Sequence, residues 1–240
     1  MLTTFENKTV IITGASAGVG AACARTFAAM KAKLVLVARG EAALNAIADE
    51  LRGQCDVLTV VMDVASNDDC LALLEKAETA FGAVHVVVNN AGMHVRGDLA
   101  KINPQDVAAM VDVNMRAPLL LSCAAIPYLQ RAGSGAIVNI GSLAGRAPLQ
   151  GAATYSATKA GLRAFSYALG DELRDHNISV GVVSPGPIDT GFIMDEIDLV
   201  EDIVFSQPMS SAQQVADAVV TVARGEETEV VLPAASAKLT

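Results

Sequence analysis

A tyrosine and a lysine lie four positions apart in the segment 152–162, at Tyr155 and Lys159. Helix-forming residues surround the pair, so we expect a helix. Residues four apart share one helix face, which would place the phenol beside the ammonium. We therefore expect Lys159 to lower the pKa of Tyr155 from its usual value of about 10. Such a tyrosine can exchange a proton with an alcohol or a carbonyl. The spacing alone also fits an ordinary surface helix, so the other motifs decide.

A glycine-rich turn, TGASAGVG at 13–20, follows the first apolar run of the chain. Glycines allow a sharp turn and a close approach to a ligand, and the start of the next helix offers N–H groups to a pyrophosphate. The GxxxGxG spacing differs from the general GxGxxG fingerprint, but its place between a strand and a helix predicts dinucleotide binding. The residues expected to contact the cofactor here are Gly14, Ser16, Gly18, Val19 and Gly20.

The second apolar run ends at Arg39, with no acidic residue at the strand end. NAD enzymes commonly carry Asp or Glu there to bind the ribose 2′-OH. An arginine can instead hold a 2′-phosphate through charge-assisted hydrogen bonds, and Ser16 could give a second bond. Arg39 therefore favours NADP(H), while NAD(H) stays possible because a solvated arginine at a helix start has the same pattern.

Polar or small residues follow the later predicted strands. Asp63 could accept a hydrogen bond from the adenine amino group, with Val64 packed on the ring, or it could cap the next turn. The small residues at 90–92 would let the cofactor lie against the backbone. Ser142 ends the fifth strand, and Asn114 lies in a helical stretch that asparagine does not favour. Strand ends of a parallel sheet meet at one edge, so we expect these groups near Tyr155.

Short apolar runs alternate with helical patterns along the chain. We expect strands at 8–13, 33–39, 57–64, 84–89, 135–142, 178–184 and 229–232. We expect helices at 18–30, 41–52, from Asn67 or Asp68 to 81, 104–131 with a break near Pro118, around Tyr155 to about His176, and 211–224. This order predicts an α/β protein with a single-domain Rossmann fold over 1–240. Its doubly wound parallel sheet would have about seven strands, with helices on both faces. Residues 187–208 are expected to form a substrate lid, with a plain surface loop as the alternative.

Composition excludes several classes of function. The 240 residues carry a net charge of −9 and no tryptophan, which argues against nucleic-acid binding. The chain has no 18-residue apolar run and no signal-peptide pattern, so we expect no membrane span and a cytoplasmic location. The four cysteines lack CxxC spacing, which indicates reduced thiols. The three histidines are too scattered for a metal site, although His94 could reach the substrate cleft.

Taken together, these residues resemble the classical short-chain dehydrogenase/reductase family, in order and spacing, over residues 5 to 190. That family uses the GxxxGxG form of the glycine turn. The residues that carry the resemblance are Thr13, Gly14, Gly18, Gly20, Asp63, Asn89, Asn90, Ala91, Gly92, Asn114, Ser142, Tyr155, Lys159, Pro185, Gly186 and Thr190.

The resemblance implies a role for each of these groups. Tyr155 would be the general acid/base, and Lys159 would lower its pKa and bind the nicotinamide ribose. Ser142 would hold the substrate oxygen, and Asn114 would anchor a water that links Lys159 to solvent. Further residues would contact the cofactor: Asn90, Ala91 and Gly92 along its length, and Pro185, Gly186, Ile188 and Thr190 around the nicotinamide.

The expected function is that of an NADP(H)-dependent oxidoreductase that interconverts a secondary alcohol and a ketone, or acts on an aldehyde. Apolar residues in 187–208 favour an apolar small-molecule substrate. One alternative is an idle dinucleotide-binding redox sensor or scaffold. Another is an epimerase or dehydratase, which would need a larger domain after Gly186. The last strand lacks the DGG motif of acyl-thioester reductases. Its absence argues against an acyl-thioester substrate and against a tetramer built on this strand. A homodimer or homotetramer is expected through the helices 119–131 and 155–176.

Overall fold

The core of the protein is one parallel sheet of seven strands. The computed structural model describes residues 1–189 and 208–233. The strand order is β3-β2-β1-β4-β5-β6-β7, and every neighbouring pair is parallel. The strands are β1 (Thr9–Thr13), β2 (Lys33–Ala38), β3 (Val57–Val61), β4 (Val86–Asn89), β5 (Gly135–Ile140), β6 (Ile178–Pro185) and β7 (Glu229–Leu232). The predicted Rossmann-type fold is confirmed. That 1–240 forms one domain stays a prediction, because 190–207 and 234–240 lie outside the described residues.

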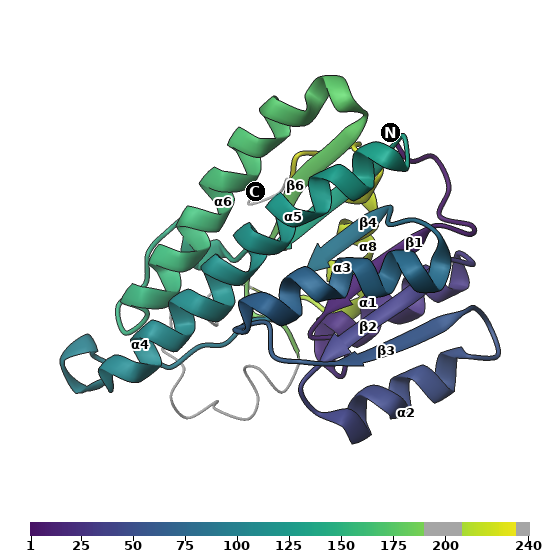
Figure 1. Cartoon of the computed structure of the whole chain (residues 1–240). Helices are drawn as coiled ribbons and strands as arrows, with labels where there is room; N and C mark the ends of the chain where they lie inside the picture. Colours follow the sequence, from purple (N-terminus) through teal and green to yellow (C-terminus); the bar gives the residue numbers. More distant parts are fainter. Residues whose placement is uncertain (190–207, 234–240) are drawn as a thin grey trace.

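Helices cover the sheet on both faces, which is why the central strands are apolar on both sides. The helices are α1 (Gly18–Ala29), α2 (Glu41–Leu51), α3 (Asn67–Phe81), α4 (Pro104–Val111), α5 (Ala117–Arg131), α6 (Ala153–Leu173) and α8 (Ala212–Ala223). One core lies between the sheet and α1, α2 and α8, and the other lies between the sheet and α3, α5 and α6. Figure 1 shows α3, α5 and α6 on a common side of the sheet.

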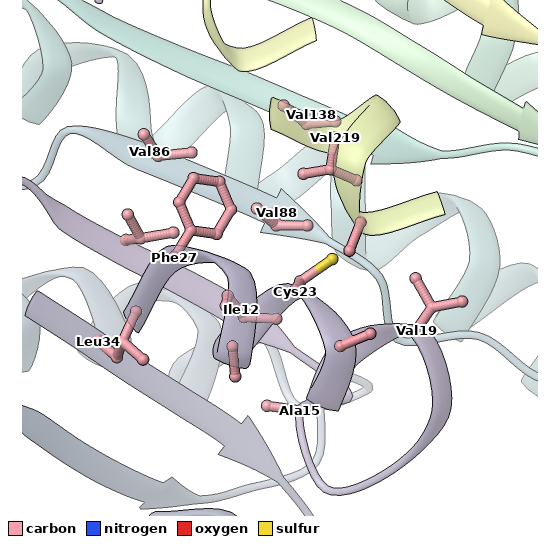
Figure 2. Close-up of a cluster of buried hydrophobic side chains, with 14 of the residues drawn as sticks. Ile12, Ala15, Val19, Cys23, Phe27, Leu34, Val86, Val88, Val138 and Val219 are labelled. Atoms are coloured by element: carbon pink, nitrogen blue, oxygen red, sulfur yellow. The ribbon is translucent and has the colours of Figure 1, made fainter. Parts of the chain in front are cut away.

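Side chains from several elements interlock in the first of these cores. Phe27 and Cys23 of α1 pack in one cluster with Ile12 of β1, and Val219 of α8 lies near Val138 of β5 (Figure 2). Their burial fixes α1 against the strands and so places the glycine turn, which lies between β1 and α1, at the carboxyl edge of the sheet.

Some predicted boundaries shift, with consequences for the site. β3 ends at Val61 and β5 ends at Ile140, so Asp63 and Ser142 lie in the turns beyond these strands. The helix cap of α3 is Ser66, whose hydroxyl accepts from the Asp69 amide, rather than Asn67 or Asp68. A serine at this position satisfies an N–H that the first helical turn leaves unpaired.

The predicted break near Pro118 is wrong. α4 continues through a π-helical turn, η2 (Asp112–Arg116), directly into α5. Pro118 falls in the first turn of α5, and the wider π-turn precedes it, so its missing N–H does not interrupt the helix. The combined helix Pro104–Arg131 is, among the described residues, the one that is long and apolar enough to cross a membrane. Helices packed in a protein core meet the same criteria, so this feature does not establish a span.

Short 3₁₀ turns complete the regular structure of the described residues. They are η1 (Leu99–Lys101), η3 (Leu143–Gly145) and η4 (Arg174–His176), which follows α6. The strand order changes direction at β1, where β2 lies on one side and β4 on the other. In open α/β sheets, ligands bind at the carboxyl ends of strands where the order reverses. The residues at this edge are therefore the first to consider as a site.

Candidate active site

The glycine turn after β1 is packed too tightly for side chains. A Cβ on Gly20 would lie 2.1 Å from the Gly14 carbonyl oxygen, and Gly14 has a φ of +66°, a conformation that favours glycine. The Asn90 side-chain amide donates to the carbonyls of Thr13 and Gly14, at 2.8 and 3.1 Å. These bonds fix the turn against the end of β4.

The start of α1 suits an anion. Its N-cap residue is Ala17, which has no side chain to accept from the first N–H groups, and its first turn carries no acid. These N–H groups and the positive end of the helix dipole point at the glycine turn. The tight turn and the uncapped helix start together fit the pyrophosphate of a dinucleotide. Ser16 lies in this turn, Gly18 is the first residue of α1, and Val19 is buried in the first helical turn.

Thr13 organises the same edge, a role that its place in the glycine-turn motif does not predict. Its Oγ1 accepts from the amides of Asn90 and Ala91, each at 3.0 Å. The partners are 77 and 78 positions away, so no local pattern could reveal the contact. The result is that residues 90–92 run directly beside the glycine turn, where the sequence places the cofactor.

Arg39 extends into solvent at the end of β2. Its side chain is 78% exposed, and its Nη1 lies 3.8 Å from Oδ2 of Asp63. Oδ1 of Asp63 accepts from the Ala65 amide at 2.9 Å, so one oxygen of this carboxylate caps the turn after β3. Val64 is buried in the core beneath α3. Arg39 and Asp63 thus lie together at the carboxyl ends of the neighbouring strands β2 and β3.

Lys159 is an enclosed cation. Its side chain runs through the interior of the site, the residue is 4% exposed, and its Nζ donates to the Ile140 carbonyl at 2.7 Å. Nζ lies 5.7 Å from the centroid of the Tyr155 ring. Burial lowers the pKa of Lys159 to about 8, because a shielded site disfavours the charged form.

The pKa of Tyr155 is raised, so the expectation that it lies below its usual value is wrong for this structure. Burial of the phenol raises the pKa, while a hydrogen bond with Ser142 and the positive charge of Arg96 act in the opposite direction and do not outweigh it. The Lys159 ammonium gives a short hydrogen bond to the Ile140 carbonyl. Tyr155 is therefore a protonated acid at neutral pH.

Ser142 begins a turn that packs against α6. It is the N-cap of η3, and its Oγ accepts from the Ala144 amide at 3.1 Å. Gly145 ends this turn against the backbone of α6, where a Cβ would lie 2.7 Å from the Lys159 carbonyl carbon. Only a residue without a side chain allows this approach, which brings the Ser142 hydroxyl to the Tyr155 phenol.

Asn114 is buried in the π-helical turn and holds the loop after β4. Its Nδ2 donates to the Met93 carbonyl at 2.7 Å, and its Oδ1 accepts from the Met93 amide at 2.8 Å. A Cβ on Gly92 would lie 3.3 Å from this oxygen and 3.7 Å from Lys159 Nζ. Asn114 thus reaches the same centre as Lys159. The water that it was expected to anchor stays a prediction.

His94 stacks on Tyr155, whereas its expected reach into a substrate cleft stays a prediction. The ring centroids are 4.1 Å apart, and the planes differ by 16°. Burial, helped by the charges of Arg96 and Lys159, lowers the pKa of His94 to about 3, so the imidazole is neutral. Its Nε2 is buried and has no hydrogen-bond partner among the residues that the structure describes. The sequence placed His94 near the cleft, but not on the tyrosine.

The segment expected to line the nicotinamide begins where β6 ends. Pro185 is the last residue of β6, and the Gly186 amide donates to the Leu232 carbonyl at 2.7 Å. Ile188 forms a bridge with Ser210, so the two ends of the predicted lid 187–208 meet. Thr190 and the rest of this lid up to 207 lie outside the described residues. No group of three potential metal ligands occurs in the described part of the chain.

Comparison with known proteins agrees with this arrangement. Residues 8–198 match the family model of the short chain dehydrogenases. An uncharacterized oxidoreductase of Staphylococcus epidermidis is 35% identical over 216 residues, which cover 90% of each chain. Ketoacyl reductase HetN of a Nostoc species is 31% identical over 96% of this chain and 80% of its own. Sulfoacetaldehyde reductase 2 of Chromohalobacter salexigens is 36% identical over 77% of this chain and 74% of its own.

A solved structure gives the same fold. A short-chain type dehydrogenase/reductase from Mycobacterium marinum superposes with a TM-score of 0.87 at 24% identity, over 95% of this chain and 94% of the other. The chain belongs to the short-chain dehydrogenase/reductase family. It is an oxidoreductase that acts on an alcohol or carbonyl group with NAD(P).

Proposed function

We propose that this protein is an NADP(H)-dependent oxidoreductase that interconverts a secondary alcohol and a ketone, or acts on an aldehyde, with Tyr155 as general acid/base. The observation that carries the proposal is the meeting of three groups: the protonated Tyr155 phenol, its hydrogen-bonded partner Ser142 and the buried Lys159 ammonium. An acid of this kind is suited to give a proton to a carbonyl oxygen as negative charge develops there.

Each residue then has a distinct part. The Ser142 hydroxyl orients the carbonyl oxygen by a hydrogen bond, and Tyr155 transfers a proton to that oxygen. Lys159 carries its positive charge below a pH of about 8 and stabilises the phenolate that the transfer leaves. The dinucleotide, when bound along Gly14–Gly20 and residues 90–92, supplies the hydride.

Arg39 supports NADP(H) as the preferred dinucleotide. Its guanidinium is largely in solvent, at the strand end beside Asp63, and Ser16 lies in the adjacent turn. A guanidinium can form two parallel, charge-assisted hydrogen bonds to a 2′-phosphate. The uncharged 2′-OH of NAD(H) would bind the guanidinium more weakly. The Asp63 carboxylate would repel a 2′-phosphate, so Arg39 has to screen it.

The test is a titration of Arg39→Asp and wild type with NADPH and NADH, followed by the fluorescence of the bound nucleotide. We expect wild type to prefer NADPH, and the variant to lose about 10- to 100-fold in NADPH affinity, the worth of a charge-assisted hydrogen bond. Arg52→Asp, the same charge change on an exposed arginine just after α2, is the control and should keep the wild-type preference. Tighter binding of NADH by wild type would contradict the assignment.

We propose a small carbonyl compound with an apolar body as substrate. The segment 187–208 supports this, because it interleaves large apolar residues with acids that disfavour anionic substrates. The relatives named ketoacyl reductase and sulfoacetaldehyde reductase support reduction as the direction. A panel of apolar ketones and aldehydes beside small anionic carbonyl compounds tests the choice, and preferential turnover of the anions would overturn it.

We also propose a homo-oligomer in a reducing, cytoplasmic environment. The four cysteines are free thiols, and Cys123 is exposed on α5. Partly exposed apolar side chains on α5 and α6, such as Ile126 and Phe165, would be covered by a second copy.

A further inference from the structure

Glu229, the first residue of β7, is a buried carboxylate that the reaction described above does not use. Its side chain is 5% exposed, although the residue belongs to an edge strand. Nothing in the sequence singled it out: it lies 66 positions from one of its partners and 45 from another. A buried charge is costly unless it is paired and hydrogen-bonded, so its contacts show what it is for.

Both oxygens of Glu229 are fully engaged. Oε1 accepts from Ser184 Oγ at 2.7 Å and from Arg163 Nε at 3.0 Å. Oε2 accepts from Arg163 Nη2 at 2.8 Å and from the Tyr167 hydroxyl at 2.9 Å, and lies 3.0 Å from Arg146 Nη1. Burial would raise the pKa of Glu229, but the bonds from Arg163, Ser184 and Tyr167 outweigh it and hold the pKa at about 2. The group is charged throughout the working range of pH.

These partners come from the three segments that form the active site. Arg146 follows η3, the turn that begins at Ser142. Arg163 lies one helical turn beyond Lys159 on α6, so the two side chains leave the same stretch of helix. Ser184 precedes Pro185 in β6, the strand that leads to the expected nicotinamide segment. Figure 1 shows α6 running along β6, which the Glu229 contacts join.

We propose that Glu229 is a positioning residue for this active site: one carboxylate ties the Ser142 turn, the Tyr155–Lys159 helix and the end of β6 into a fixed arrangement. The bonds of a carboxylate to a guanidinium are directional, so they fix orientation as well as distance. Ser142 and Tyr155 must meet within hydrogen-bond reach, and a misplacement of about 1 Å can lower a rate by about 100-fold. The catalytic consequence rests on the proposed function, whereas the structural one does not.

The first experiment follows hydrogen–deuterium exchange in the protein without nucleotide, for wild type and Glu229→Gln. The amide keeps the shape of the carboxylate but removes the charge and turns a donor towards the arginines. We expect faster exchange in peptides that cover 142–150 and the part of α6 around Lys159, with no change in β1 to β3. Glu50→Gln, which breaks the exposed Arg25–Glu50 pair, is the control and should leave both active-site segments unchanged.

The second experiment measures kinetics and nucleotide binding on the same variants. We expect Glu229→Gln to lower kcat about tenfold or more while the nucleotide Kd stays within about threefold, because the glycine turn is untouched. Arg146→Ala removes one ion pair of Glu229 and leaves the carboxylate paired with Arg163. This variant should therefore fold even if Glu229→Gln does not. It should loosen 142–150 alone and lower kcat less.

Three results would overturn the proposal. The first is unchanged exchange in both active-site segments of Glu229→Gln. The second is uniformly faster exchange across the whole sheet, which would make Glu229 a residue for general stability. The third is a wild-type kcat in Glu229→Gln. If wild type turns over no alcohol or carbonyl compound, the proposed function fails, and the exchange data still decide whether Glu229 holds the three segments together.

Discussion

Lys159 holds an ammonium group in a place that the protein shields from water. Its pKa falls from 10.5 to about 8, which means that burial disfavours the charge more than the bond to Ile140 favours it. A group of this kind lowers stability in its charged form. In the proposed function, Tyr155 needs a nearby positive charge when it loses its proton, and that requirement belongs to catalysis and not to folding.

A pH-dependent gain in stability is therefore expected on Lys159→Met. Below a pH of about 8 the buried ammonium destabilises wild type by up to about 3 kcal/mol, since a shift of one pKa unit corresponds to about 1.4 kcal/mol. From pH 8 to 10.5 the unfolded chain binds more protons than the folded one, so wild-type stability rises and the advantage of the methionine shrinks.

Urea unfolding without nucleotide at pH 7 and at a pH of about 9.5 measures this difference. Lys101→Met, at an exposed site paired with Asp98, is the control and should change stability by less than about 0.5 kcal/mol. A methionine variant that is less stable than wild type at pH 7, or a difference that does not vary with pH, would show that the ammonium is well compensated.

At the scale of secondary-structure elements, two short turns, η2 and η3, position Asn114 and Ser142. The π-helical turn η2 points Asn114 at the loop after β4, and η3 lays Ser142 on α6. Neither geometry follows from a local sequence pattern. The sequence did mark Asn114 as a residue that helices do not favour, whereas Ser142 was expected simply to end the fifth strand.

Gly145→Ala tests the contact between η3 and α6. The added methyl would meet the Lys159 carbonyl carbon and oxygen at 2.7 and 2.8 Å, and these backbone atoms cannot rotate away. We expect the turn to move, with a loss of about 1–3 kcal/mol in unfolding free energy and a fall of about tenfold or more in kcat.

Gly53→Ala is the matched control, because no atom beyond the adjoining residues lies within 4 Å of the Cβ that it adds. Its stability and kcat should stay close to those of wild type. Wild-type kcat in Gly145→Ala would show that the tight packing of η3 is not needed for the reaction.

Across the whole molecule, the sequence predicts the order of elements better than their partners. The last strand, Glu229–Leu232, has the predicted bounds, and all seven strands occur in the predicted order. Each strand can be predicted locally, because a short apolar run bounded by turn residues is typical of a buried strand. The links between Thr13 and Asn90, and between Glu229 and Arg163, join residues far apart in the chain, and no local pattern encodes them. The pKa of Tyr155 was mispredicted for the same reason, since burial depends on the complete fold.

The assembly is a prediction at this scale as well. Sedimentation velocity at micromolar concentration should detect a dimer or a tetramer, since apolar side chains on α5 and α6 remain partly exposed in a single copy. A single monomeric species at that concentration would contradict a homo-oligomer built on these helices.

The most direct test of the account is Tyr155→Phe, which removes one hydroxyl and keeps the ring that stacks on His94. Turnover of the best alcohol or carbonyl substrate and NADPH binding should be measured on the same preparations. The account predicts a fall in kcat of about 10²- to 10⁴-fold, with the NADPH Kd within about threefold of wild type. Substantial turnover by the variant would contradict Tyr155 as the general acid/base. If wild type bound no dinucleotide at all, the whole assignment of the site would fail.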